Sequence, residues 1–242
     1  MKYRDLLYGS YVSANKRYVY ETVNQRAMAK GWRNLRWFWR GWLPPLSSRI
    51  LDLGCGAGNL LGFFKSVGYT DITGVDVSPE QVACARQICP NVIQSDVFHF
   101  LHREGIGRFD MITAFDVLEH LTRDEMIDLV KMIRGCLNPN GRLVIQLPNG
   151  DSPFIGSVFY SDATHETCLT AVSLRHILES CGLKGCQFRE YCPAPTGVIS
   201  GLRYLLWRVI HLVIKAIHYV ETGRPSTGVY TRTFLCRCQT DQ

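Results

Sequence analysis

The stretch ILDLGCGAGN, residues 50–59, decides the fold of this 242-residue chain. It begins as an apolar run and continues into Gly54, Gly56 and Gly58, which let the backbone turn sharply beside a ligand. A dinucleotide-binding turn has the pattern G-x-G-x-x-G, whereas here the third glycine comes one residue early and Asn59 takes its usual place. The pattern predicts a strand, a ligand-binding turn and a helix, but not a dinucleotide ligand.

Asp52, two residues before the first glycine, narrows the choice of ligand. A carboxylate so close to the turn opposes a pyrophosphate, which the following helix N-terminus would otherwise attract. It favours a ligand with positive charge and no phosphate, and S-adenosylmethionine, with its ammonium and sulfonium groups, is such a ligand. We expect Asp52 and four residues of the turn to bind this cofactor: Gly54, Cys55, Gly56 and Asn59.

Two further aspartates follow the next predicted strands. Asp76 ends the run ITGVD, where a carboxylate can accept both ribose hydroxyls, and Val77 follows it. Asp96 ends the third run, placed to accept from an adenine amino group, with Val97 beside the ring. These four residues complete the adenosine side of the predicted cofactor site.

Strand and helix patterns alternate from about residue 49 onward. Apolar or β-branched runs predict strands at 49–53, 72–76, 91–95, 109–115, 142–147, 185–191 and 230–237. Capping boxes predict helices that begin at Ser78 and at Thr122, the second running to about Leu137, and patterns at 170–181 and 201–220 are also helical. Such alternation predicts an α/β fold with a doubly wound parallel sheet.

Five segments resemble, in order, the motifs of class I S-adenosylmethionine-dependent methyltransferases: ILDLGCGAGN, GVDVSPEQVACAR, QSDVFHFL, FDMITAFDVLEHL and LNPNGRLVIQLPN. The resemblance covers residues 48–150. It implies a Rossmann-like, seven-stranded, mostly parallel sheet with a reversed last strand near 230–237 and helices on both faces. Phe115 and Asp116, after the fourth strand, would then border the cofactor and its methyl group.

The resemblance and the patterns together define the expected domains. Residues 1–47 are predicted to form a helical extension or lid, and residues 48–242 the methyltransferase domain. Acceptor-side insertions are expected at about 148–170 and 193–229.

Other functions fit less well. A nicotinamide-dependent dehydrogenase would need a glycine at Asn59 and a Tyr-x-x-x-Lys pair, which is not found. A net charge of +6 lacks the dense basic stripe of a nucleic-acid binder, and FDVLEHL differs from the motifs that base methyltransferases place after the fourth strand. A non-catalytic S-adenosylmethionine-binding module stays an alternative, although it would lack acid–base residues.

The ten cysteines point to neither a metal site nor disulfides. No C-x-x-C occurs, and Cys236-x-Cys238 has no neighbouring pair. We therefore expect reduced, structural cysteines, no metal, and a cytoplasmic location.

The segment FYSDATHETCLTAVSLRHILESCGL, residues 159–183, resembles the Asp-x-Thr-His segment and following helix of bacterial methyltransferases associated with polysaccharide and lipopolysaccharide assembly. This resemblance implies that the acceptor is a sugar hydroxyl of a glycan or glycan precursor. A small non-sugar metabolite is the alternative acceptor.

A sugar hydroxyl is a poor nucleophile, so its methylation benefits from a base, and a neutral histidine is suited to that role. His165, on a loop that can close over a sugar, is the predicted base. His120 or Asp116 is predicted to help hold the hydroxyl, and His120 is the alternative base.

Two basic, aromatic stretches remain. Residues 30–45 carry four tryptophans and three arginines, which fits either a lid over the cofactor or a helix packed across the sheet edge. In 202–220 a sector holds Arg208, His211, Lys215 and His218 among apolar residues. This helix is too charged to cross a bilayer, but it fits peripheral contact with the inner membrane surface, a homodimer contact, or packing over the active site.

Overall fold

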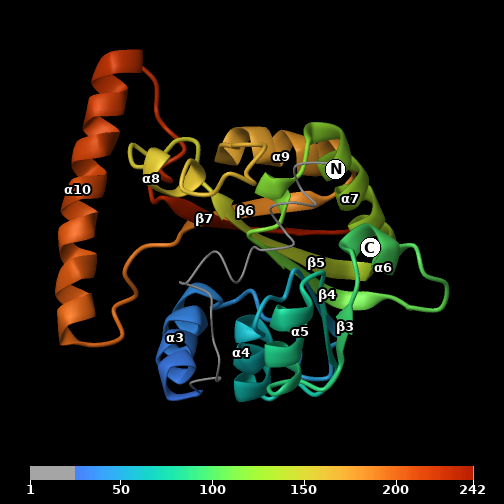
Figure 1. The fold of residues 1–242 in the computed structure, drawn as a ribbon. Helices are drawn as coiled ribbons and strands as arrows, with labels where there is room; N and C mark the ends of the chain where they lie inside the picture. The colour runs from blue at the N-terminus through green and yellow to red at the C-terminus, as the bar shows by residue number, and fades with distance from the viewer. Residues whose placement is uncertain (1–24, 242) are drawn as a thin grey trace.

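The computed structural model describes residues 25–241, built around a seven-stranded sheet with strand order β3-β2-β1-β4-β5-β7-β6 (Figure 1). The strands are β1 (Ile50–Leu53), β2 (Ile72–Asp76), β3 (Val92–Gln94), β4 (Phe109–Phe115), β5 (Leu137–Pro148), β6 (Lys184–Glu190) and β7 (Thr233–Gln239). The first five are parallel, and β7 runs antiparallel to both β5 and β6. The predicted sheet with its reversed last strand is confirmed.

Helices cover both faces of the sheet. On one face lie α3 (Gln25–Phe38), α4 (Asn59–Val67) and α5 (Pro79–Arg86); on the other lie α6 (Val97–Leu101), α7 (Arg123–Gly135) and α9 (Ala171–Ser180) (Figure 1). Two separate clusters of buried apolar side chains fill the layers between helices and sheet. This double layer is the arrangement that strand–helix alternation predicted.

Local sequence sets the helix ends. The Thr122 hydroxyl and the Glu125 side chain form the predicted capping box at the start of α7. Ser78 caps α5, with Pro79 as its first residue. The helix predicted to reach Leu137 ends earlier, at Gly135, because Leu137 already pairs with Phe109 as the first residue of β5.

The tryptophans after α3 belong to the core. Trp39 and Trp42 are fully buried, and Trp39 stacks on Phe115 with 5.9 Å between ring centroids. The Trp42 indole donates to the Gln187 side chain of β6 at 3.1 Å. This part of the predicted extension therefore packs across the sheet, while residues 1–24 lie outside the described residues.

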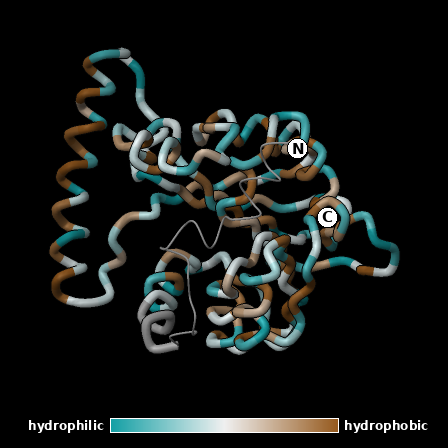
Figure 2. Tube along the Cα trace, in the orientation of Figure 1, coloured by the Kyte–Doolittle hydropathy of each residue, from teal (hydrophilic) through white to brown (hydrophobic). Residues whose placement is uncertain are grey.

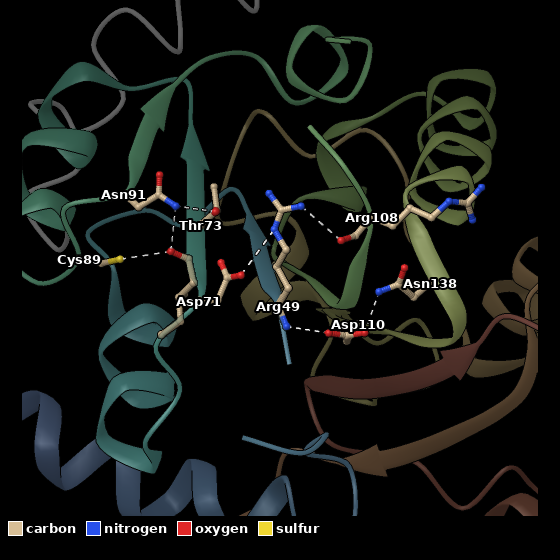
Figure 3. A network of polar contacts seen from close by, with 9 residues as sticks. Arg49, Asp71, Thr73, Cys89, Asn91, Arg108, Asp110 and Asn138 are labelled. Atoms are coloured by element: carbon tan, nitrogen blue, oxygen red, sulfur yellow. Dashed lines mark hydrogen bonds and ion pairs between the residues drawn. The ribbon is translucent and has the colours of Figure 1, made fainter. Parts of the chain in front are cut away.

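A polar network ties the amino ends of the strands together (Figure 3). The Arg49 backbone N–H donates to Asp110 at 2.7 Å, and Asn138 donates to the same carboxylate at 2.8 Å. Asn91 likewise joins β3 to Thr73 of β2 at 2.7 Å. These bonds fix the strands at one edge of the sheet and leave the opposite, carboxyl edge for ligands.

Three more helices complete the fold: the short helices η1 (Leu118–His120) and α8 (Gly156–Phe159) and the long helix α10 (Val198–Thr222). All ten cysteines are free thiols. Among residues 25–241, no helix combines the length and apolar character needed to cross a membrane.

Candidate active site

The site lies where β1 and β4 are neighbours, because the chain crosses over in opposite directions from these two strands. In open α/β sheets ligands bind at such a switch point, beyond the carboxyl ends of the strands. The Gly-rich turn follows β1, and Asp116 follows β4. The topology therefore brings the predicted cofactor residues and the predicted catalytic residues to the same edge.

Glycines with positive φ shape the turn after β1. Gly54 has φ +67°, and a Cβ there would lie 2.5 Å from Val117 Cγ2. Gly56 has φ +53°, and among residues 25–241 no atom beyond its chain neighbours lies within 4 Å of the position that a Cβ would take. A ligand can therefore approach the backbone of Gly56 directly.

Asp76 supports this turn from β2. Its Oδ2 accepts from the Gly56 N–H at 2.8 Å, and its Oδ1 accepts from the Ser78 N–H at 2.9 Å. Burial raises the pKa of the carboxyl, and these N–H donors oppose the rise. Each oxygen carries one of these two bonds, so both have capacity to accept from a ribose hydroxyl. Val77 follows and is exposed.

Asp96 at the end of β3 caps α6. Its Oδ1 accepts from the N–H groups of Phe98 at 2.9 Å and His99 at 3.2 Å. Both bonds use one oxygen, so Oδ2 can serve an adenine amino group. Val97 is partly buried against the core and flanks the same edge.

Asp52 lies beneath the turn, 2% exposed, and accepts from the Thr113 hydroxyl of β4 at 2.6 Å. Burial raises its pKa to about 7, the Thr113 bond opposes the rise, and the nearby charge of Asp76 adds to it. A cationic ligand above the turn would favour the ionised form. Asp52 therefore suits an ammonium group and disfavours a phosphate.

The side chains of Cys55 and Asn59, two further residues predicted to bind the cofactor, both contact the protein itself. The Cys55 side chain is buried beside Gly74 of β2, so this residue offers the ligand only its backbone. Asn59 begins α4, and its backbone and side-chain oxygens accept from the Trp32 indole at 3.1 and 3.3 Å.

Asp116 marks the end of β4. It has φ +54°, uncommon for a residue with a side chain, and it accepts from the Gln146 amide at 3.1 and 3.2 Å. The carboxylate is open to solvent on one side, while protein on its other sides raises its pKa. Its charge, together with burial, also raises the pKa of Tyr191, a neighbour that sequence reasoning did not identify.

The loop after β5 is held against η1 by backbone hydrogen bonds. The carbonyl of Glu119 accepts from the N–H groups of Glu166 at 2.7 Å and Thr167 at 3.1 Å. This contact brings the imidazoles of His120 and His165 to 4.7 Å between ring centroids. The structure thus places both predicted catalytic histidines together.

Hydrogen bonds at the Nδ1 atoms fix the orientation of both imidazole rings. Thr164 donates its hydroxyl proton to Asp162 at 2.6 Å, so the same oxygen accepts from His120 Nδ1 at 2.8 Å. His165 Nδ1 donates to the Phe159 carbonyl at 2.8 Å. In both neutral rings the Nε2 atom therefore carries the lone pair.

Glu119 is the residue that the sequence analysis missed. It is 1% exposed, and neither carboxylate oxygen has a hydrogen-bond partner among the residues that the structure describes. Burial raises its pKa well above the usual value, and the charges of Asp116 and Asp162 add to the rise. One oxygen of Glu119 and one nitrogen each of His120 and His165 all lie within 4.8 Å of one another.

A family model described as a methyltransferase domain matches residues 24–187. A ubiquinone biosynthesis O-methyltransferase of Xanthomonas axonopodis pv. citri (strain 306) is 33% identical over 115 residues, which cover 44% of this chain and 46% of that protein. An O-methyltransferase of Penicillium expansum is 27% identical over 58% of this chain and 54% of its own. The chain thus spans about half the length of these curated relatives.

Solved structures share the fold. An S-adenosylmethionine-dependent methyltransferase from Archaeoglobus fulgidus superposes with a TM-score of 0.66 at 20% identity, covering 95% of this chain and 99% of that one. Magnesium protoporphyrin IX methyltransferase from Synechocystis PCC 6803, solved with bound S-adenosylmethionine, gives a TM-score of 0.57 at 14% identity, covering 100% and 98%.

We predict that Asp52 makes the ligand-free protein less stable as the pH rises. Its pKa is about 7 in the folded state against 3.8 for the free side chain, so only the folded state keeps this proton between about pH 4 and pH 7. Relative to Asp52→Asn, wild-type stability should fall by at most about 1.4 kcal/mol per pH unit across this window. Urea unfolding at several pH values measures the difference. The exposed Asp128→Asn variant should follow the wild type, and parallel curves for wild type and Asp52→Asn would contradict the assignment.

Proposed function

This chain belongs to the methyltransferase-domain family, and we propose that it transfers a methyl group from S-adenosylmethionine to a hydroxyl oxygen of a glycan or glycan precursor. One observation carries the proposal. A carboxylate-rich cofactor side and an acceptor side with two imidazole Nε2 lone pairs meet at the switch point of the sheet.

The cofactor side fits S-adenosylmethionine in its polar groups. The Asp76 carboxylate offers an acceptor to each ribose hydroxyl, and Asp96 Oδ2 offers one to the adenine amino group. Asp52 offers negative charge to the ammonium, and the backbone of Gly56 gives open access beside the turn. At this turn the carboxylates of Asp52 and Asp76 would repel a pyrophosphate, which cations would be needed to bind.

The acceptor side fits a hydroxyl. S-adenosylmethionine supplies a methyl group on a sulfonium: as the new O–C bond forms, the S–C bond breaks, S-adenosylhomocysteine is left and the hydroxyl proton is released. The residues of this chain must orient the acceptor oxygen and dispose of that proton. Asp116, with its raised pKa, and the Nε2 atoms of His120 and His165 are suited to these tasks.

The choice of a sugar rests on the segment of Asp162, Thr164 and His165, which resembles that of polysaccharide-associated methyltransferases. The structure gives this motif a physical role, because Asp162 and Thr164 orient the partner imidazole of His120. The O-methyltransferases of Xanthomonas and Penicillium favour a second candidate acceptor, a small non-sugar metabolite with a hydroxyl. Both candidates share oxygen as the methylated atom.

Calorimetric titration with S-adenosylhomocysteine and with NAD tests the cofactor. S-adenosylhomocysteine should bind and NAD should not. Asp76→Ala should weaken binding about 10- to 150-fold, because a charge-assisted hydrogen bond contributes about 1.5–3 kcal/mol. The exposed Asp71→Ala variant is the matched control. Tight NAD binding without a response to S-adenosylhomocysteine would reject the proposal.

Loss of His165 should cost more turnover than loss of His120. His165→Ala is expected to lower kcat by about two to four orders of magnitude, because positioned activation of the hydroxyl is lost, with cofactor affinity nearly unchanged. His120→Ala should act more on the acceptor KM. The exposed His176→Ala variant serves as control, with methyl transfer measured against panels of saccharides and phenolic metabolites. Near-wild-type turnover of His165→Ala would exclude the assignment, and no transfer to any hydroxyl despite cofactor binding would favour a non-catalytic binding module.

A further inference from the structure

The carboxylate of Glu119 is buried without a partner among residues 25–241. In this part of the chain neither oxygen has a hydrogen-bond partner, and no lysine or arginine forms an ion pair with it. A buried carboxylate in this position must either take up a proton or bind a cation. Asp116 and Asp162 lie close enough to add negative potential at this point.

The imidazoles of His120 and His165 lie beside this carboxylate. The Nδ1 atoms of His120 and His165 donate to Thr164 and to the Phe159 carbonyl, so in the neutral rings the lone pair lies on Nε2. One ligand atom from each of the three side chains lies within 4.8 Å of the other two. The two imidazoles and the Glu119 carboxylate therefore converge. None of the described residues donates a hydrogen bond to this carboxylate.

We infer that Glu119, His120 and His165 bind a divalent transition-metal cation. Two imidazoles and one carboxylate form a catalytic ligand set that leaves coordination positions open for water or substrate. The outer contacts are those that metal-binding histidines usually have: a hydroxyl relayed to Asp162 on one ring and a backbone carbonyl on the other. The proposal departs from the sequence-based expectation of no metal, which rested on the cysteine spacings.

This inference deepens the proposed function and rests on it for the substrate. The acceptor hydroxyl would bind at an open position, and the cation would lower the pKa of that hydroxyl. The proton then passes to Asp116 or to water, while the oxygen forms the bond to the methyl carbon. An imidazole that binds the cation through Nε2 cannot also take this proton, so His165 would activate the hydroxyl through the metal and not as the base.

Calorimetric titration of chelator-treated protein with Mn²⁺ tests the site, since Mn²⁺ avoids thiolate ligands and ten cysteines are present. Wild type should bind one equivalent. Glu119→Gln keeps the side-chain shape and should weaken binding at least about 100-fold, while the exposed Glu104→Gln should not change it. Thr164→Val leaves the ligands in place but removes the acceptor for His120 Nδ1, and should cost about 10- to 100-fold.

Titration of the same samples with S-adenosylhomocysteine separates the two proposals. Unchanged S-adenosylhomocysteine binding by Glu119→Gln shows that this variant is folded. Mn²⁺ binding that depends on Glu119, without any S-adenosylhomocysteine binding, would support the metal site and reject the proposed function. S-adenosylhomocysteine binding with no Mn²⁺ binding, or with equal Mn²⁺ binding by wild type and Glu119→Gln, would overturn the metal site. Chelator-resistant turnover that is lost in His165→Ala would also overturn it, and would leave His165 as the base.

Helix α10 supports a second, independent inference. It stands at one side of the molecule, and Figure 2 shows apolar residues along much of its length. None of its residues is buried. Its contacts to the body include those of Tyr204 with Trp37, of Trp207 with Glu190 and of His211 with Tyr230.

The opposite side of α10 is a broad exposed apolar face. At 100° per residue, one sector contains Val198, Leu202, Leu205, Leu206, Val209, Leu212, Val213, Ala216 and Val220, and Val198 and Val220 are 93% and 84% exposed. Arg203 borders this sector on one side, and Arg208 and Lys215 border it on the other. The histidines of the predicted polar sector, His211 and His218, are half-buried, so the outward face is apolar with cationic margins.

We propose that this face lies in the surface of a bilayer that contains anionic lipids. An apolar face flanked by arginine and lysine matches acyl chains between anionic headgroups. A second copy of the helix fits less well, because the cationic margins would meet one another and Glu221 is the one acid of α10.

Vesicle co-sedimentation tests this proposal with phosphatidylcholine alone and with added phosphatidylglycerol. Wild type should bind the anionic vesicles, and Leu205→Glu with Val209→Glu should abolish binding. Arg208→Gln with Lys215→Gln should lower affinity about 30-fold, whereas Val172→Glu, an exposed apolar residue of α9, should have no effect. Absence of vesicle binding would overturn the proposal. A dimer that the two glutamates dissociate would instead assign this face to a second copy.

Discussion

The backbone carbonyl of Glu119 accepts two N–H groups from the loop after β5, and the acceptor side of the site depends on this contact. It joins a short helix after β4 to a segment more than forty residues later in the chain. The same contact places His165 beside His120 and encloses the Glu119 side chain. Together with the Thr164–His120 and Thr167–Leu121 hydrogen bonds, this contact holds the loop against η1.

The sheet supplies the other half of the site. Because β1 and β4 are neighbours, the Gly-rich turn and Asp116 lie at one edge, while the network around Arg49 and Asp110 fixes the opposite edge. Two of the carboxylates that we propose for the cofactor are oriented by protein donors: Asp52 by Thr113, and Asp76 by two backbone N–H groups. A site organised before ligands arrive loses less free energy on ordering when they bind.

Local signals explain why much of this could be predicted from sequence. Apolar runs, two capping boxes and the glycine turn specify the elements and the polar residues that follow each strand. Asp76 and Asp96 could be placed at one edge from the sequence because carboxylates at strand ends share an edge in a parallel sheet. The packing of Trp39 under Phe115 could not be distinguished from a lid, because composition alone does not tell which face of a helix is covered.

Glu119 was missed for a different physical reason. Its neighbours in space, His165 and Asp162, are distant in sequence, and its burial follows from how the loop closes and not from any periodic pattern. The most direct test of the account is anomalous diffraction from crystals grown with Mn²⁺ and S-adenosylhomocysteine. We expect one anomalous peak bonded to the Glu119 carboxylate and to both Nε2 atoms, on the side that faces the sulfur. A protonated Glu119 carboxyl hydrogen-bonded to an imidazole, with no peak between them, would contradict it.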